Sequence, residues 1–141
     1  MSQDSAQPGG TVRIERPTEP SYLYAATVLN VVDGDTLDLT IDLGFHTDRR
    51  GRFRLADIDA PELDTKAGRA ARDFVVTRLA NARTLVVKTQ HAQRTDLYGR
   101  YIAHVFYSPT QVDIDACFQT GTHLNNELLD DGHAELLVMG G

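Results

Sequence analysis

The sequence is poor in cysteine: Cys117 is the single one among 141 residues, so no disulfide can form within the chain. Cys117 has no second cysteine or histidine at metal-ligand spacing, which favours an ordinary core or loop thiol. The chain has no apolar run near eighteen residues, which argues against a membrane span. Its first residues, MSQDSAQPGG, lack the basic and apolar regions of a secretory signal, although a signal removed earlier would leave no trace.

Lysine is also scarce. The chain has two lysines beside twelve arginines, and its Asp and Glu give a net charge of −6. A protein from a high-salt environment has this bias, because a hydrated acidic surface resists salting out. A GC-rich genome would also exchange Lys for Arg, so both origins stay open. A net acidic protein has no general attraction to nucleic acid, and any nucleic-acid partner must be held by a local site.

The remaining composition is that of one globular domain. Hydrophobic residues make up 41% and charged residues 24%, and a chain of this length can bury a core without disulfides. Residues 1–20 are polar and contain Gly9-Gly10 and three prolines, which predicts a flexible N-terminal tail. Residues 21–141 are predicted to form the folded domain.

Hydrophobic periodicity predicts the main elements. Five segments have the composition or alternation of strands, namely residues 22–32, 36–43, 52–58, 84–90 and 101–107. Residues 66–82 have helical spacing, residues 108–122 read as a long loop, and a short helix over 123–133 ends near Gly132. The pattern predicts a mainly β, α+β domain: a five-stranded OB-fold barrel with two to three helices.

Three short stretches carry most of the notable charged residues. Asp33-Gly34-Asp35-Thr36 has the Asp-Gly signature of a hairpin turn. FRLADIDAPE, residues 53–62, follows a strand, and its proline favours an extended residue before it. QRTDLYGR, residues 93–100, reads as a polar connection with a glycine suited to positive φ. Each stretch alone is consistent with an ordinary turn.

In this order, DGDT, FRLADIDAPE and QRTDLYGR together resemble the staphylococcal nuclease (thermonuclease) family. The intervening helix and LNNELLDDGHAEL resemble the same family, so the similarity covers roughly residues 22–137. Each motif is weak alone, whereas three in one order are a strong signal. The resemblance implies a phosphodiesterase on a five-stranded barrel, with one Ca²⁺ as cofactor.

The resemblance also assigns the metal ligands. The family's calcium carboxylates fall on Asp35 and Asp59, its backbone carbonyl ligand falls on Ala60, and Asp33 matches a nearby acid. Ca²⁺ takes six to eight oxygen ligands, so two carboxylates, a carbonyl and waters leave room for a phosphate oxygen.

The catalytic residues follow from the same resemblance. The family's catalytic Glu falls on Glu62, where it would orient or deprotonate a water. Its phosphate-binding arginines fall on Arg54 and Arg100, whose planar guanidinium groups can bind two phosphate oxygens at once. Tyr98 matches a tyrosine that contacts the substrate phosphate.

The sequence departs from the family at four places. Ala60 replaces a Thr, and Leu97 replaces a Lys that would contact phosphate. The loop after Glu62, residues 63–68, is short, and the C-terminal residues lack the tyrosines that stack on the substrate base. These differences predict weaker and less base-selective binding than in the staphylococcal enzyme.

Alternative interpretations stay open. Arg49, Arg50 and Arg52 fit either a basic track for nucleic acid or a solvated hairpin tip. The five histidines have no HxxH or HExxH spacing, which argues against a histidine metal site. The first functional hypothesis is a calcium-dependent endonuclease acting on DNA, with RNA as a further candidate substrate. The second is a non-catalytic nucleic-acid-binding or structural module with protein partners in a larger assembly, such as a virion.

Overall fold

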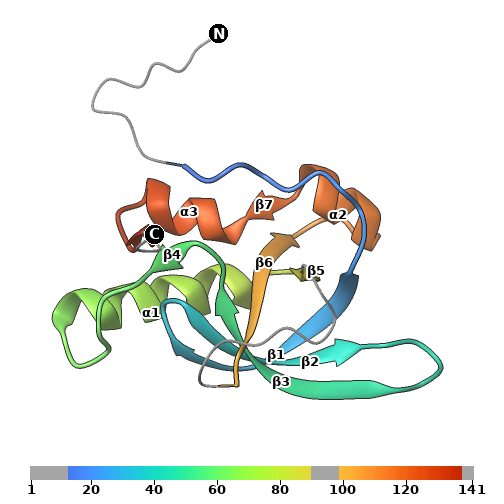
Figure 1. The fold of residues 1–141 in the computed structure, drawn as a ribbon, viewed down its shortest axis with the longest axis horizontal. Helices are drawn as coiled ribbons and strands as arrows, with labels where there is room; N and C mark the ends of the chain where they lie inside the picture. Colours follow the sequence, from blue (N-terminus) through green and yellow to red (C-terminus); the bar gives the residue numbers. More distant parts are fainter. Residues whose placement is uncertain (1–12, 90–98, 138–141) are drawn as a thin grey trace, which may run out of the picture.

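A computed structural model describes residues 13–89 and 99–137 of the chain (Figure 1). The predicted fold class is confirmed: five strands form a closed, mixed OB-type barrel, accompanied in the described residues by three helices. The elements, in chain order, are β1 (Leu23–Asp33), β2 (Thr36–Asp42), β3 (Asp48–Leu55), β4 (Ile58–Asp59), α1 (Lys66–Ala80), β5 (Thr84–Thr89), β6 (Tyr101–Ser108), α2 (Ile114–Thr120), β7 (Thr122–His123), α3 (Leu124–Asp130) and β8 (Glu135–Leu136).

The barrel strands follow the order β3-β2-β1-β5-β6, and a parallel pairing of β3 with β6 closes the barrel. In this closing pair Phe53 lies opposite Tyr101, and Arg54 lies opposite Ile102. Strand β2 has the predicted alternation, with Leu37, Leu39 and Ile41 buried in the core. The inward side chains of all five strands therefore form one hydrophobic core, as period-2 alternation requires.

Strand β3 differs from its prediction at both ends. It begins at Asp48 instead of residue 52, so the β2–β3 hairpin extends beyond the barrel (Figure 1). Its tip turns through Gly44, Phe45 and His46, which all have positive φ. The charged sequence DRR looked like part of a turn because it carries no apolar residue, yet it pairs fully with β2. The strand ends at Leu55, and the chain bends at Asp57, whose φ is 67°.

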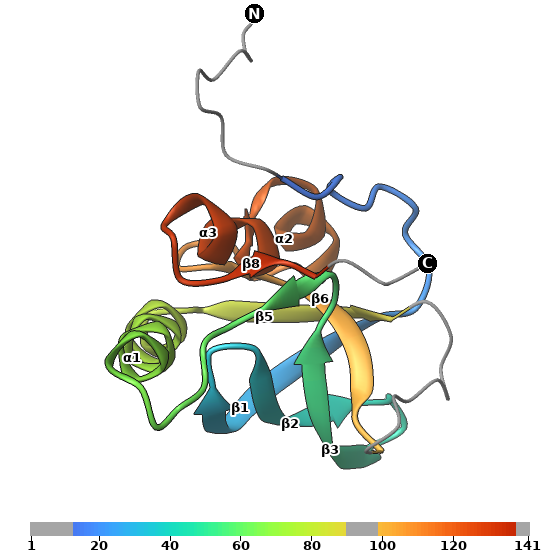
Figure 2. The same cartoon turned by 60° about the vertical axis from the view of Figure 1, so that its left-hand side comes forward.

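Helix α1 lies against the outside of the barrel (Figure 2). Thr65 is its N-cap, and the Thr65 hydroxyl accepts a hydrogen bond from the Gly68 N–H at 2.9 Å. The predicted apolar face is buried at Ala71, Val75 and Leu79. No helix in residues 13–89 or 99–137 is long and apolar enough to cross a membrane.

The prediction of a long loop over residues 108–122 was wrong, because this segment contains helix α2. The Asp113 carboxylate caps its first turn by accepting from the Ala116 N–H at 2.9 Å. Cys117 and Phe118 are buried beside β5 and β6, which stabilises a helix too short to show a clear period. The predicted core thiol is confirmed, and burial raises the pKa of Cys117 to about 11.

Two adjacent asparagines at the start of α3 connect distant parts of the chain. Asn125 is buried; its amide oxygen accepts from the Val105 N–H at 3.0 Å, and its amide nitrogen donates to the Ala56 carbonyl at 3.0 Å. Asn126 accepts from the Ile14 N–H and donates to the Ile14 carbonyl, both at 2.8 Å. Of the predicted tail over 1–20, residues 1–12 lie outside the described part, and Ile14 is attached to α3.

A histidine pair links β6 to β7. His104 Nδ1 lies 3.0 Å from His123 Nε2, and Asn126 Nδ2 lies 3.0 Å from His123 Nδ1. Because the Asn126 amide nitrogen can only donate, His123 Nδ1 accepts, and His123 Nε2 donates to His104. Burial is the main reason that the pKa of His123 falls to about 3 and that the pKa of His104 is also lowered. The pair is therefore neutral at pH 7.

Acidification is expected to destabilise the fold through His123. The unfolded chain binds this proton below pH 6.5 and the folded chain only near pH 3, so stability is lost as pH falls between these values. Between pH 7 and pH 5 the loss from His123 is about 2 kcal/mol. Urea unfolding of His123→Asn should show a pH dependence weaker by that amount, whereas His46→Asn, at the exposed hairpin tip, should match the unmodified protein. Parallel profiles for all three proteins would contradict this explanation.

Candidate active site

The turn between β1 and β2 positions the first of the predicted metal carboxylates. Asp33 pairs with Thr36, so Gly34 and Asp35 form a two-residue hairpin loop. A Cβ atom on Gly34 would lie 2.8 Å from the Cβ atoms of Ala60 and Ala71, so this glycine is needed for close packing. The turn is thus an ordinary hairpin in sequence terms and also a tightly packed part of the site.

Asp35 is buried, and each of its carboxylate oxygens has a donor. Its Oδ1 accepts from the Thr36 hydroxyl at 2.9 Å, and its Oδ2 accepts from the Ala60 N–H at 2.9 Å. The Asp35 N–H donates to Asp33 Oδ1 at 3.0 Å. These bonds hold the β1–β2 turn against the segment that follows β4, two regions that are 25 residues apart in sequence.

Arg54 joins the two predicted calcium carboxylates. Its Nη1 lies 3.2 Å from Asp35 Oδ2, and its Nη2 donates to Asp59 Oδ1 at 3.3 Å. The Arg54 side chain is only 14% exposed, whereas that of Asp59 is 59% exposed. The guanidinium group therefore lies between a buried and an accessible carboxylate.

The pKa values of Asp33 and Asp35 are shifted in opposite directions. Burial alone would raise the pKa of Asp35, but the hydrogen bond with Asp33, the Ala60 N–H and the Arg54 charge together lower it. The pKa of Asp33 is raised, chiefly by burial and also by the neighbouring Asp35. Asp35 therefore keeps its negative charge, and Asp33 is the acid of the pair that takes up a proton first.

One polar atom of this group is left without a hydrogen bond. Arg54 Nη1 is buried and close to Asp35, but it is not aligned with any acceptor in the described part of the chain. A buried N–H of a charged group without an acceptor is costly, and in native proteins strain, a catalytic role or a bound water or ion accounts for such atoms. An oxygen of a bound anion would satisfy it.

The predicted catalytic acid, Glu62, lies in the short segment between β4 and α1, and its side chain is exposed. Its carbonyl oxygen accepts from the Thr65 N–H at 3.0 Å and from the Thr65 hydroxyl at 2.6 Å. Gly68 lies directly behind it: a Cβ atom there would be 1.8 Å from the Glu62 carbonyl oxygen. Sequence reasoning missed this contact, for which the only signal was a glycine in the first turn of a helix.

Arg100 immediately precedes β6, two residues before Ile102, which pairs with Arg54. The backbone therefore brings both predicted phosphate-binding arginines to the closing strand pair, with Arg54 on β3 and Arg100 just before β6. Tyr98 and Leu97 lie outside the described residues. The phosphate contact predicted for Tyr98, and the loss of one predicted for Leu97, stay predictions.

The residues assigned to Ca²⁺ suit a hard cation in their chemistry, because they offer only oxygen atoms. Asp35 and Asp59 are carboxylates held near one another by Arg54, and the adjacent Ala60 carbonyl accepts no hydrogen bond within the described residues. No group of three or more His, Cys, Asp and Glu side chains in that part of the chain could hold a metal. A metal would thus depend on this carbonyl and on waters beside the two carboxylates.

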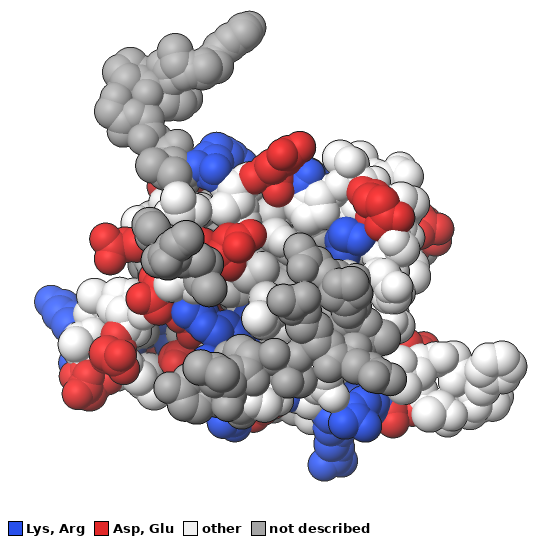
Figure 3. Space-filling view, viewed as in Figure 1, with Lys and Arg blue, Asp and Glu red and all other residues white. Residues whose placement is uncertain are grey.

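Two of the three basic residues of the hairpin, Arg49 and Arg52, have partners within the chain. Arg52 binds Asp38 through two nitrogens, at 2.7 and 3.0 Å. Arg49 donates to the Tyr101 hydroxyl at 3.0 Å. Acidic and basic side chains are interspersed over the face shown in Figure 3. Both named arginines thus have partners within the chain, which favours the interpretation of a charged hairpin over that of a general nucleic-acid track.

Comparison with known proteins agrees with this geometry. The family model described as "Staphylococcal nuclease homologue" matches residues 52–140. The chain belongs to the staphylococcal nuclease homologue family. The matched region contains Arg54, Asp59, Glu62 and Arg100. Asp35 precedes it and joins the group through its contacts with Arg54 and Ala60.

Two similar proteins are longer than this chain. An uncharacterized protein of Methanocaldococcus jannaschii is 27% identical over 137 residues, which cover 82% of this chain and 60% of that protein. Protein ParB of Escherichia coli is 34% identical over 79 residues, which cover 56% of this chain and 40% of ParB. The chain therefore spans only part of the length of both relatives.

Proposed function

We propose that this staphylococcal nuclease homologue is a calcium-dependent endonuclease that hydrolyses phosphodiester bonds of DNA, with RNA as a further candidate substrate. The observation that carries the proposal is Arg54, a largely buried guanidinium group between Asp35 and Asp59 whose Nη1 makes no hydrogen bond within the described residues. A substrate phosphate supplies the missing acceptor. Guanidinium groups suit this task because they present parallel donors to two oxygens.

The proposed division of labour follows from position. Glu62 is accessible and accepts the proton of the attacking water. Arg54 on β3 and Arg100 just before β6 hold the negative charge that builds up on the phosphate in the transition state. Asp35, Asp59 and the Ala60 carbonyl are the ligands offered to Ca²⁺, whose chemistry when bound is to neutralise phosphate charge and orient water.

The ligand set predicts weak metal binding in the absence of substrate. Two carboxylates and one carbonyl are few charged ligands for Ca²⁺, and affinities at this end of the range are on the order of 10⁻⁴ to 10⁻³ M. Arg54 also competes electrostatically with the cation for both carboxylates. Cleavage should therefore require Ca²⁺ at about millimolar concentration.

The test is cleavage of internally labelled single-stranded DNA and RNA with Ca²⁺, with EDTA, and after Ca²⁺ is restored. The series should run from low to molar salt, because the acidic composition leaves the salt optimum open. Internal fragments that appear only with Ca²⁺ are the expected result. If a protein that circular dichroism shows to be folded cleaves neither substrate at any salt, the non-catalytic module becomes the better explanation.

A further inference from the structure

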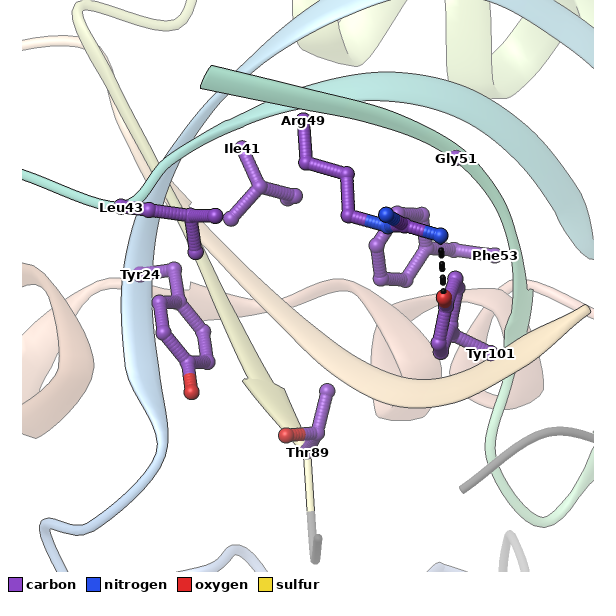
Figure 4. Close-up of a pocket in the computed structure, with 8 residues that line it drawn as sticks. All are labelled: Tyr24, Ile41, Leu43, Arg49, Gly51, Phe53, Thr89 and Tyr101. Carbon is purple, nitrogen blue, oxygen red and sulfur yellow. Dashed lines mark hydrogen bonds between the residues drawn. The ribbon is translucent and has the colours of Figure 1, made fainter. Parts of the chain in front are cut away.

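One end of the barrel is hollow. A pocket of about 460 Å³ opens there, and we call it the mouth pocket (Figure 4). All five barrel strands contribute to it. Within residues 13–89 and 99–137, its lining consists of Tyr24, Ile41, Leu43, Arg49, Gly51, Phe53, Thr89 and Tyr101. Its volume lies within the range of small-molecule sites, and a ring-sized group would fit.

Gly51 keeps the mouth pocket open, and Arg49 lies at its rim. Gly51 lies beside the Tyr101 ring, and a Cβ atom there would be 3.2 Å from both Tyr101 and Phe53. Any larger side chain at this position would narrow the pocket. Arg49 reaches across its rim and donates to the Tyr101 hydroxyl at 3.0 Å (Figure 4). The rings of Phe53 and Tyr101 are thus left accessible within the pocket, and the Arg49 guanidinium lies at its opening.

The mouth pocket contains a polar group without a partner. The Thr89 hydroxyl is buried and has no hydrogen-bond partner in residues 13–89 or 99–137. Thr89 itself is 7% exposed and lies between the Tyr24 side and the Tyr101 side of the pocket (Figure 4). A valine would fill the same volume without the cost of an unsatisfied hydroxyl. The threonine therefore points to a ligand with its own donor or acceptor.

The lining also favours a flat, polarisable ligand. Phe53 and Tyr101 are tilted by 32° with ring centroids 5.3 Å apart, and Tyr24 lies across the pocket from them (Figure 4). The Arg49 guanidinium lies 5.9 Å from the Tyr101 ring centroid. Aromatic rings beside an arginine are the usual means by which proteins bind unstacked bases. The edge of a nucleobase carries donors and acceptors, either of which could bond the Thr89 hydroxyl.

The mouth pocket adjoins the proposed catalytic residues along two strands. Phe53 and Tyr101 face each other in the pairing that closes the barrel, and the next residues along are Arg54 and Ile102. Because successive side chains of a strand point to opposite faces, Phe53 faces the pocket and Arg54 faces the other side of β3. Arg100 likewise directly precedes Tyr101. A nucleic-acid strand bound by its phosphate at Arg54 must therefore turn around the barrel rim for one of its bases to enter the pocket.

We propose that the mouth pocket binds one unstacked nucleobase of a single-stranded substrate, and this rests on the proposed nuclease function. The Thr89 hydroxyl bonds the edge of the base, and Tyr24 and Tyr101 contact its faces. The pocket would supply base contacts within the barrel itself. Because a paired base cannot enter it, single strands bind in preference to duplexes.

Binding without metal separates this proposal from catalysis. In EDTA, the affinity for a short oligothymidylate is compared with that for an abasic strand of equal length, by fluorescence anisotropy. Both strands have the same phosphates, so a difference reports on the base. The oligothymidylate should bind about 10-fold more tightly, the size of one base-stacking contact.

Matched threonine variants locate the base. Thr89→Val should reduce the 10-fold difference by a few-fold, the size of one lost hydrogen bond, while raising the melting temperature, because it replaces an unsatisfied hydroxyl with a methyl group. Thr27→Val, at an exposed position of β1, should leave the difference unchanged. Arg54→Ala should weaken the binding of both strands by the same factor, because it removes a contact with phosphate.

Equal affinities for the two strands, or a Thr89→Val protein that keeps the full difference, would overturn the proposal. A protein that discriminates between the strands but cleaves neither substrate with Ca²⁺ would support the mouth pocket and refute the nuclease. A protein that cleaves with Ca²⁺ but binds the two strands equally would support the nuclease and refute the mouth pocket.

Discussion

Glu62→Gln is expected to lower the rate of phosphodiester cleavage about 10³-fold, the middle of the range for loss of a general base. The amide has the size of the carboxylate but cannot take a proton from water. The Glu62 side chain is exposed and makes no hydrogen bond or ion pair within the described residues, so the melting temperature should not change. Single-turnover cleavage at saturating Ca²⁺, alongside thermal unfolding, measures both quantities.

Asp64→Asn is the matched control, because Asp64 is an exposed acid in the same short segment. It should cleave at the rate of the unmodified protein. A Glu62→Gln rate within a few-fold of that control would remove Glu62 from the mechanism and direct attention to another base.

Gly68→Ala is expected to lower the cleavage rate about 10²-fold, although Gly68 is in a helix and carries no functional group. Its Cβ atom would lie 1.8 Å from the Glu62 carbonyl oxygen and 2.4 Å from the carbonyl carbon, so the Glu62 segment or the helix must move. A displacement near 1 Å at a catalytic group can cost about 10²-fold in rate. The cleavage rate and the melting temperature should therefore both be lower than in the unmodified protein.

The direction of the stability change is diagnostic. Helix propensity alone would make Gly68→Ala stabilising by about 1 kcal/mol. Ala70→Gly, at an exposed position of the same helix, provides the opposite control: it should lose about that much stability and keep its activity. If Gly68→Ala proves more stable and equally active, the close contact with Glu62 has no functional meaning.

The barrel was predictable from the sequence because its strands have simple patterns. Leu37, Leu39 and Ile41 alternate with polar residues, and the helix α1 carries Ala71, Val75 and Leu79 at helical spacing. Both patterns are local, so a single chain reveals them. Helix α2 was missed because two buried residues in seven give no period, and its capping residue Asp113 reads equally well as a loop acid.

The site was predictable in its residue types but not in its contacts. The resemblance gave Arg54, Asp35 and Asp59, yet nothing in the sequence says that the first lies between the other two. The buried amides of Asn125 and Asn126 were missed for the same reason, because polar residues beside a leucine pair look solvent-exposed. Long-range hydrogen bonds depend on which segments the fold brings together, and no local pattern encodes that.

The pair of hydrogen bonds between Ile14 and Asn126 has a consequence for the order in which the protein matures. The two residues are 112 positions apart. At ribosomal speeds of about 5 to 20 residues per second, Ile14 emerges roughly 6 to 22 seconds before its partner exists. The segment around Ile14 can therefore dock only after α3 has been made. A nascent chain halted before α3 should leave residues 13–16 open to proteases that cannot cut them in the finished protein.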